Sequence, residues 1–162
     1  MINGAMLHLS LNHIPVVGFP LCFFLLLAGN IKQSRDLVQA GYVGLVLMAL
    51  ITLPVWKSGG PAAHLLRGNP DVTHDSIHEH AEAADFGAIA GAVMGALGLV
   101  GWWLSRRPEG APKIILGVAL FGTLFTSVVM GRIAHLGGLI RHPEIEAETK
   151  VISVNIGLKP AQ

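Results

Sequence analysis

Charged side chains are scarce in this chain of 162 residues: Asp, Glu, Lys and Arg make up 13% of it, whereas hydrophobic residues make up 52%. A soluble domain of ordinary composition carries roughly 25% charged residues. The mean hydropathy of +0.59 agrees with this shortage. The composition therefore predicts a protein whose surface faces lipid rather than water, and the length suggests a single domain.

Cysteine and basic residues are also in short supply. The single cysteine, Cys22, excludes an internal disulfide and any Cys-x-x-Cys metal or redox motif. The net charge of +1 leaves no basic stripe for phosphates, which excludes nucleic acid as a partner. No Lys or Arg precedes Lys32, so the basic region of a cleaved signal peptide is missing. Hydrolase, zinc-protease and phosphate-loop motifs are absent too, so we expect no enzymatic turnover by the chain itself.

Four apolar stretches are long enough to cross a bilayer as helices. A hydrocarbon core of ~30 Å needs about 20 helical residues, and lipid requires the backbone to be hydrogen-bonded within each segment. The stretches cover residues 14–29, 37–56, 83–104 and 114–131. We therefore expect an all-α, integral membrane four-helix bundle in residues 1–142, with an extramembrane tail in 143–162. Pro15 and Pro20 predict a kinked first helix that begins near Asn12.

The distribution of basic residues predicts the orientation of the bundle. The two short connections, residues 31–36 and 105–113, contain five Lys or Arg. The longer connection, residues 57–82, contains two basic residues and four acidic ones. By the positive-inside rule, the short connections face the cytoplasm. Both termini then lie outside, on the periplasmic side of a bacterial inner membrane.

All eight histidines fall on one predicted face of the membrane. They lie before the first span, between the second and third, and after the fourth, and an even number of spans brings these regions to the same side. The set is His8, His13, His64, His74, His78, His80, His135 and His142. Two explanations stay open: the histidines build a site, or this face simply has longer loops and so more polar residues of every kind.

The start of the third span places a histidine above a row of small residues. Ser76 and Glu79 have the spacing of a capping box, which predicts a helix that begins near Ile77. The residues that follow at intervals of three or four, and so share one face, are His80, Ala84, Gly87, Gly91 and Gly95. Such a groove lets a neighbouring helix or a flat ligand approach closely, and helix packing is the commoner use.

The fourth span repeats this pattern, because Thr123, Ser127, Gly131 and His135 are spaced by four. The region after His135 has two readings. If the helix continues through residues 137–138, which are both glycine, His142 lies near the same face as His135. If these glycines break the helix, His142 lies on a loop that folds back over the bundle.

Two helices that each carry an imidazole above small residues suit a b-type haem, which takes an axial histidine from each helix. We expect His13 and His80 as the axial ligands. His135 or His142 would complete the site or hold a second cofactor.

Other side chains near these histidines have expected roles in the same site. Gly87 and Gly91 would give the porphyrin edge room to lie. Arg132 and Arg141 would pair with its propionates. Asp85, an ionisable residue just inside the third span, is expected to orient one of the histidines, relay protons or make a structural polar contact.

Three segments, residues 7–18 (LHLSLNHIPVVG), 78–85 (HEHAEAAD) and 131–145 (GRIAHLGGLIRHPEI), resemble an uncharacterised family of small bacterial four-span membrane proteins. Members of that family open with an Asn-His-Ile-Pro motif and close with a Gly-Gly-x-Ile-Arg-His-x-Glu-Ile motif. The resemblance covers the chain from Leu7 to Ile145. It implies that His13, His80 and His142 are motif positions, with His8 a weaker match, and it carries no activity. The layout is also similar to that of four-helix b-type cytochrome domains.

These observations predict a membrane-embedded haem-b-binding subunit of a respiratory or photosynthetic-type complex. It would pass electrons between a periplasmic electron carrier and quinone or a partner complex. One alternative is a membrane protein that binds Cu, Zn or Ni through His8, His13, His80 and His142. Another is a structural or pigment-holding accessory subunit. In each case the expected partners are the lipid bilayer and either other membrane subunits or further copies of the chain.

Overall fold

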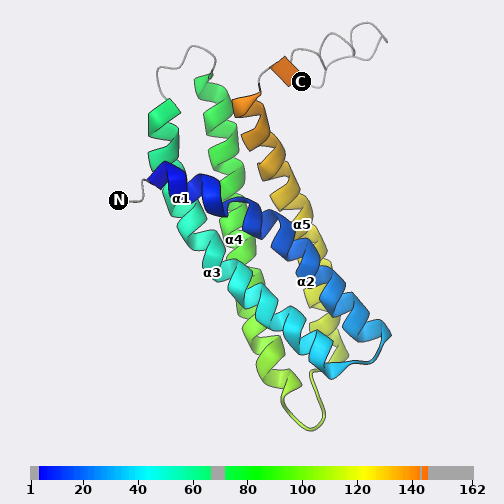
Figure 1. The fold of residues 1–162 in the computed structure, drawn as a ribbon. Helices are drawn as coiled ribbons and strands as arrows, with labels where there is room; N and C mark the ends of the chain where they lie inside the picture. Colours follow the sequence, from blue (N-terminus) through cyan, green and yellow to red (C-terminus); the bar gives the residue numbers. More distant parts are fainter. Residues whose placement is uncertain (1–3, 67–71, 143, 146–162) are drawn as a thin grey trace, which may run out of the picture.

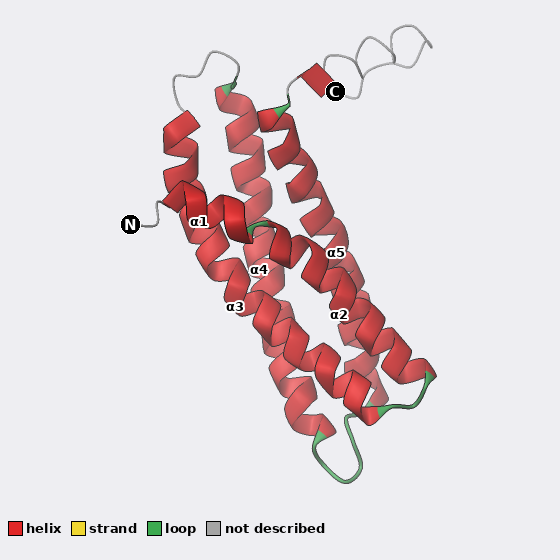
Figure 2. Cartoon of the chain, viewed as in Figure 1, coloured by secondary structure: helices red, strands yellow, loops and turns green. Residues whose placement is uncertain are grey.

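The computed structural model describes residues 4–66, 72–142 and 144–145 of the chain, and the five helices within them account for nearly all of these residues (Figure 1). The helices are α1 (Gly4–Leu11), α2 (His13–Ile31), α3 (Arg35–Leu66), α4 (His74–Ser105) and α5 (Lys113–Arg141). The described residues contain no strand (Figure 2). The predicted all-helical architecture is therefore confirmed for the described part of the chain.

Four segments of the described chain are long and apolar enough to cross a membrane: Gly4–Ile31, Arg35–Leu66, His74–Ser105 and Lys113–Arg141. Each contains one of the four apolar stretches predicted from the sequence. Apart from residues 144–145, the predicted extramembrane tail, residues 143–162, lies outside the described residues.

The four long helices form a ring. Helix α2 contacts α3 and α5, and α4 contacts the same two helices. The short helix α1 lies across α3 in Figure 1 and makes most of its contacts with it. The apolar core at the centre of the ring is small and includes Phe19, Leu26, Tyr42, Leu45 and Ala119, all fully buried.

Helices α1 and α2 are separated by an interruption at Asn12 (Figure 2). Pro15 explains its position. Proline has no N–H to donate to the carbonyl four residues earlier, and its ring clashes with that carbonyl, which here belongs to Leu11, the last residue of α1. Proline is tolerated in the first turn of a helix, so α2 begins normally at His13. The sequence predicted the start of α2 but missed α1.

Helices α3 and α4 approach each other closely because glycines line the facing side of α4. A Cβ added to Gly98 would lie 2.7 Å from the backbone oxygen of Tyr42, and one added to Gly101 would lie 2.6 Å from Cζ of the same tyrosine. Gly95 faces Ala49 in the same way. Small residues at these positions let the two backbones pack.

The two glycines expected to make room for a porphyrin face neighbouring helices. A Cβ on Gly87 would collide with Cδ1 of Ile133 on α5. A Cβ added to Gly91 would lie 3.5 Å from Cζ of Phe19 on α2 and 3.6 Å from Thr52 on α3. Of the two uses predicted for this groove, the structure has helix packing.

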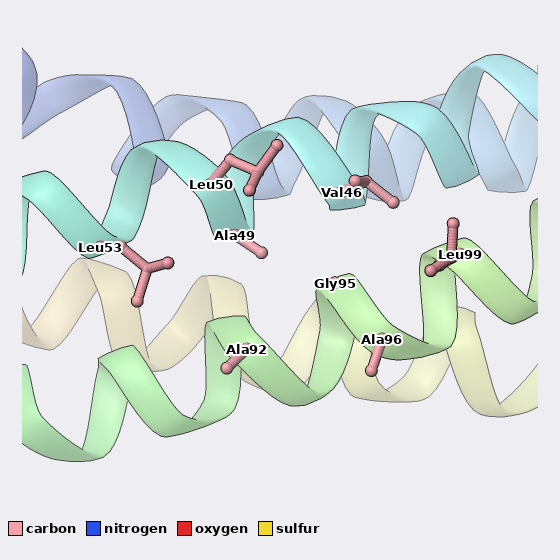
Figure 3. A pocket seen from close by; sticks show the side chains of 8 residues that line it. All are labelled: Val46, Ala49, Leu50, Leu53, Ala92, Gly95, Ala96 and Leu99. Carbon is pink, nitrogen blue, oxygen red and sulfur yellow. The ribbon is translucent and has the colours of Figure 1, made fainter.

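On the outside of the α3–α4 pair lies a shallow groove of about 270 Å³ (Figure 3). All eight residues that line it are apolar, among them Leu50 and Leu53 of α3 and Leu99 of α4. Without a polar group, this groove has nothing with which to bind an ion or carry out chemistry.

The predicted capping box at the start of α4 was wrong by three residues. The N-cap is Thr73, whose Oγ1 accepts a hydrogen bond of 3.2 Å from the backbone N–H of Ser76. Ser76 Oγ donates in turn to the Thr73 carbonyl at 2.9 Å. Threonine is a good N-cap, and Asp75 in the first turn suits the positive end of the helix dipole. The helix therefore begins at His74 rather than near Ile77.

Replacing Gly98 with alanine is expected to lower the stability of the bundle by about 1–3 kcal/mol, because the new methyl group meets backbone that cannot move alone. The matched control is Gly117→Ala, since an added Cβ there has no heavy atom within 4 Å. That variant should be unchanged or slightly more stable, because alanine is the better helix former. Thermal unfolding in detergent, followed by circular dichroism, compares the two. Equal melting temperatures for both variants would contradict the close packing of α3 on α4.

Candidate functional site

Two histidines from different helices meet at the end of the bundle that carries α1. The ring centroids of His8 on α1 and His80 on α4 are 6.4 Å apart, and the ring planes are inclined at 86°. Both residues are partly buried, whereas His13, His64, His74, His78, His135 and His142 are exposed. His8 and His80 are therefore the two imidazoles that the described structure withdraws from the surface and places together.

Each of these rings is held through Nδ1 by a backbone carbonyl. His8 Nδ1 lies 2.9 Å from the oxygen of Val55 on α3, and His80 Nδ1 lies 3.2 Å from the oxygen of Ile133 on α5. A carbonyl can only accept, so each Nδ1 carries the proton and donates it. In the neutral ring, the lone pair is then on Nε2. A metal-binding histidine is commonly prepared in this way, with its second nitrogen bonded to a carbonyl.

Small residues leave space for both rings. An added Cβ on Gly59 would lie 3.7 Å from His8 Cε1, and one on Gly137 would lie 3.1 Å from His80 Cε1. At Gly137 a larger residue would push the imidazole aside. Helix α5 continues through Gly137 and Gly138 to Arg141, so these glycines do not break the helix and one of them makes room for His80.

Asn12 supplies an unpaired polar atom one helical turn from His8. Its backbone N–H donates to the His8 carbonyl at 2.9 Å, which places the two residues on the same side of the chain. Its side-chain Oδ1 is buried and has no hydrogen-bond partner among the described residues. A buried acceptor of this kind normally finds a donor, because leaving it unpaired costs free energy.

Asp85 contacts a tryptophan, Trp56, in the described structure. Its Oδ1 accepts a hydrogen bond of 2.6 Å from Nε1 of Trp56 on α3. Of the roles expected from the sequence, the structure has the structural polar contact, which joins α3 to α4.

The structure pairs His80 with His8 rather than with His13, the partner predicted from the sequence. His13 is the first residue of α2 and is exposed. His8 lies on α1, the helix that the sequence reading missed. The available signal was Pro15: its effect on Leu11 predicts a break, and an apolar stretch before that break can form a second short helix that carries His8.

His135 also lies away from the pair, although it was predicted to stand above a row of small residues. Thr123 is buried, Ser127 is half-buried, and Gly131 and His135 are exposed. Each step of four residues turns about 40° beyond a full turn, so three steps rotate the row from the core to the outer surface. Spacing by four alone, without an intervening step of three, does not keep one face.

His142 and the two arginines expected near the propionates are likewise exposed. Arg132 and Arg141 lie on the outer side of α5. Beyond the helix, His142 Nδ1 lies 2.9 Å from Glu144 Oε1. A backbone hydrogen bond at Glu144 and then the bond with His142 lower the pKa of the Glu144 carboxyl, which favours its charged form. This contact belongs to the surface and is separate from the His8–His80 pair.

The His8–His80 pair is a two-histidine arrangement. Among the described residues, no three His, Cys, Asp or Glu side chains are grouped closely enough to hold a metal ion together. An ion at this pair would therefore have two protein nitrogens as ligands and take any others from water.

No protein-family model, curated protein or solved structure matches this chain. The resemblance to small four-span membrane proteins and the cofactor predicted from the sequence accordingly stay predictions.

Proposed function

We propose that this chain is an integral membrane protein that binds a transition-metal ion between His8 and His80. The observation that carries the proposal is the pair of Nδ1–carbonyl hydrogen bonds, to Val55 and Ile133. They fix both rings and leave both Nε2 lone pairs available. Neutral imidazole suits Cu, Zn and Ni, the metals predicted as the alternative to haem.

The spacing of the rings supports the same proposal. Zinc and similar ions bind imidazole nitrogen at about 2.0–2.1 Å, so two rings on opposite sides of one ion have centroids roughly 6 Å apart. The observed separation is 6.4 Å. The separation of the two ring centroids is therefore compatible with one ion bound between the rings.

Asn12 would complete the surroundings of the ion. Its buried Oδ1, unpaired among the described residues, is an acceptor for a water molecule bound to the metal. Metal-bound water is a strong hydrogen-bond donor because the ion withdraws electron density from it. With two protein ligands, such a site has positions left for water or for a small ligand.

Haem b is the second candidate, because trans ligation of a haem iron requires the same ring separation. It would give the electron-transfer function predicted from the sequence. The lack of free space below His80 counts against haem, since Ile133 covers Gly87, and Phe19 and Thr52 cover Gly91. A porphyrin plane would have to displace these side chains, whereas a single ion would not.

The outer surface of the bundle supports membrane insertion. Large apolar side chains cover it, and some are largely exposed, such as Phe121 at 81% and Ile31 at 71%. Apolar surface of this extent is unfavourable in water but suits lipid. The outer face of the bundle would then contact lipid, other membrane subunits or a second copy of the chain.

The charges at the ends of the bundle support an orientation with both termini outside, at the periplasmic face of a bacterial inner membrane. The connections α2–α3 and α4–α5 lie at the same end in Figure 1. There the guanidinium of Arg106 lies 4.9 Å from the Trp102 ring centroid, and that of Arg107 lies 4.3 Å from the Trp103 centroid. Tryptophans are typical of a membrane–water interface, and an excess of basic residues in short connections is typical of the cytoplasmic side.

Replacing either His8 or His80 with alanine is expected to reduce the number of bound Zn²⁺ or Cu²⁺ ions by one per chain, because one imidazole cannot hold the ion alone. The metal content is measured by inductively coupled plasma mass spectrometry after the purified protein has been loaded and passed through a desalting column. The matched controls are His13→Ala and His135→Ala, since both side chains are exposed. They should retain the wild-type stoichiometry.

The same preparations distinguish the two cofactors. If the reduced spectrum of the protein as isolated has an α-band, and this band is lost in His80→Ala and His8→Ala, the pair binds haem b rather than a bare ion. Unchanged metal content in both variants, together with a colourless protein, would overturn the proposed site altogether.

Orientation is tested by cysteine labelling of intact cells in a Cys22→Ala background. Asp75→Cys, at the start of α4, is expected to react with a membrane-impermeant maleimide, because this end is assigned to the outside. Glu109→Cys, in the connection between α4 and α5, is expected to be protected until the cells are permeabilised. The reverse pattern would invert the orientation without changing the fold.

A further inference from the structure

A second pair of histidines lies on the opposite side of α4 from His80. His74 and His78 are one turn apart, and residues at this spacing are neighbours on the surface of a helix. His78 and His80 point about 160° apart around the helix. The two pairs therefore cannot share one ion, and His74 with His78 needs an explanation of its own.

The hollow beside this second pair has room for a ligand. It has a volume of about 450 Å³ and lies between the ends of α3 and α4. His74, Ile77 and His78 line it from α4, and Gly60 and Ala63 line it from α3. An added Cβ on Gly60 would have no heavy atom within 4 Å, so the small residues of α3 keep the space next to the imidazoles open.

A carboxylate lies beside the second histidine of this pair. Glu82 lies one turn beyond His78, and its Oε1 is 3.3 Å from His78 Nε2. The negative charge favours a cation at this position. A carboxylate hydrogen-bonded to a metal-binding imidazole also orients the ring and raises its basicity.

We propose that His74 and His78 form a surface site for a divalent transition-metal cation, with Glu82 as their carboxylate partner. The two imidazoles chelate one ion, and water supplies the remaining ligands. Because both imidazoles belong to one face of the same helix, binding of the second is intramolecular, and the pair is expected to exceed the affinity of a single exposed histidine. The site does not depend on His8 or His80.

Copper titration of the full chain in detergent tests this site. The titration uses Cu²⁺ in excess glycine, which competes with single histidines, and it is followed by calorimetry and electron paramagnetic resonance. In a His8→Ala/His80→Ala background, one Cu²⁺ with imidazole nitrogen coupling should remain. His74→Ala or His78→Ala should then weaken its binding at least about tenfold, through loss of the chelate. His64→Ala, an exposed histidine on α3, should have no effect.

Unchanged copper affinity in both His74→Ala and His78→Ala would overturn the surface site. An equal loss in His64→Ala would do so as well, because it would indicate unspecific binding. If the double-alanine background does not fold, the wild-type chain serves instead: His78→Ala should lower the number of bound ions by one, and no change in this number contradicts the proposal. Failure here would leave the His8–His80 site untouched, because that site is tested by its own variants.

Discussion

The position of α1 depends on a hydrogen bond that the chain cannot make. Pro15 has no N–H for the Leu11 carbonyl, so the first helical segment is interrupted at Asn12 and α1 lies across α3. Lying there, His8 reaches the Val55 carbonyl on α3 and the ring of His80 on α4. The pair exists because of this break. A continuous helix from residue 4 to 31 would present His8 in a different direction.

The bundle supplies the other half of the site through glycine. Close contact of α4 with α3 and α5 depends on Gly98, Gly95 and Gly87. A larger residue at any of these positions would force the neighbouring atoms to move. The same contacts fix the rotation of α4 about its axis. That rotation directs His80 inward, toward Ile133, and turns His78 outward to the surface hollow. Helix packing and the placement of the two histidine pairs therefore have a common cause.

Local patterns predicted the helices but only part of the site. Apolar length identified α2 to α5, because helices of this kind depend mainly on local composition, and spacing by three and four placed Gly87, Gly91 and Gly95 on a packed face. His80 was a predicted site residue, and the structure brings it to another imidazole. The pairing of His80 with His8 was not predicted. Pro15 indicated where α2 begins, but the short helix α1 before it, which carries His8, was not expected. Sequence spacing does not show which side chain fills the groove beside a glycine. That Ile133 covers Gly87 is a result of tertiary packing.

The tautomer of the His8 and His80 rings can be measured without any substitution. It tests most directly whether these two rings are prepared to bind a metal ion. Nitrogen-15 NMR of the histidine rings distinguishes the Nδ1–H from the Nε2–H tautomer. In metal-free protein, we expect the Nδ1–H tautomer for His8 and His80, because their Nδ1 atoms donate to Val55 and Ile133. On addition of Zn²⁺, the Nε2 resonances of both rings should shift together. The Nε2–H tautomer in both rings, or resonances that do not respond to Zn²⁺, would contradict this expectation.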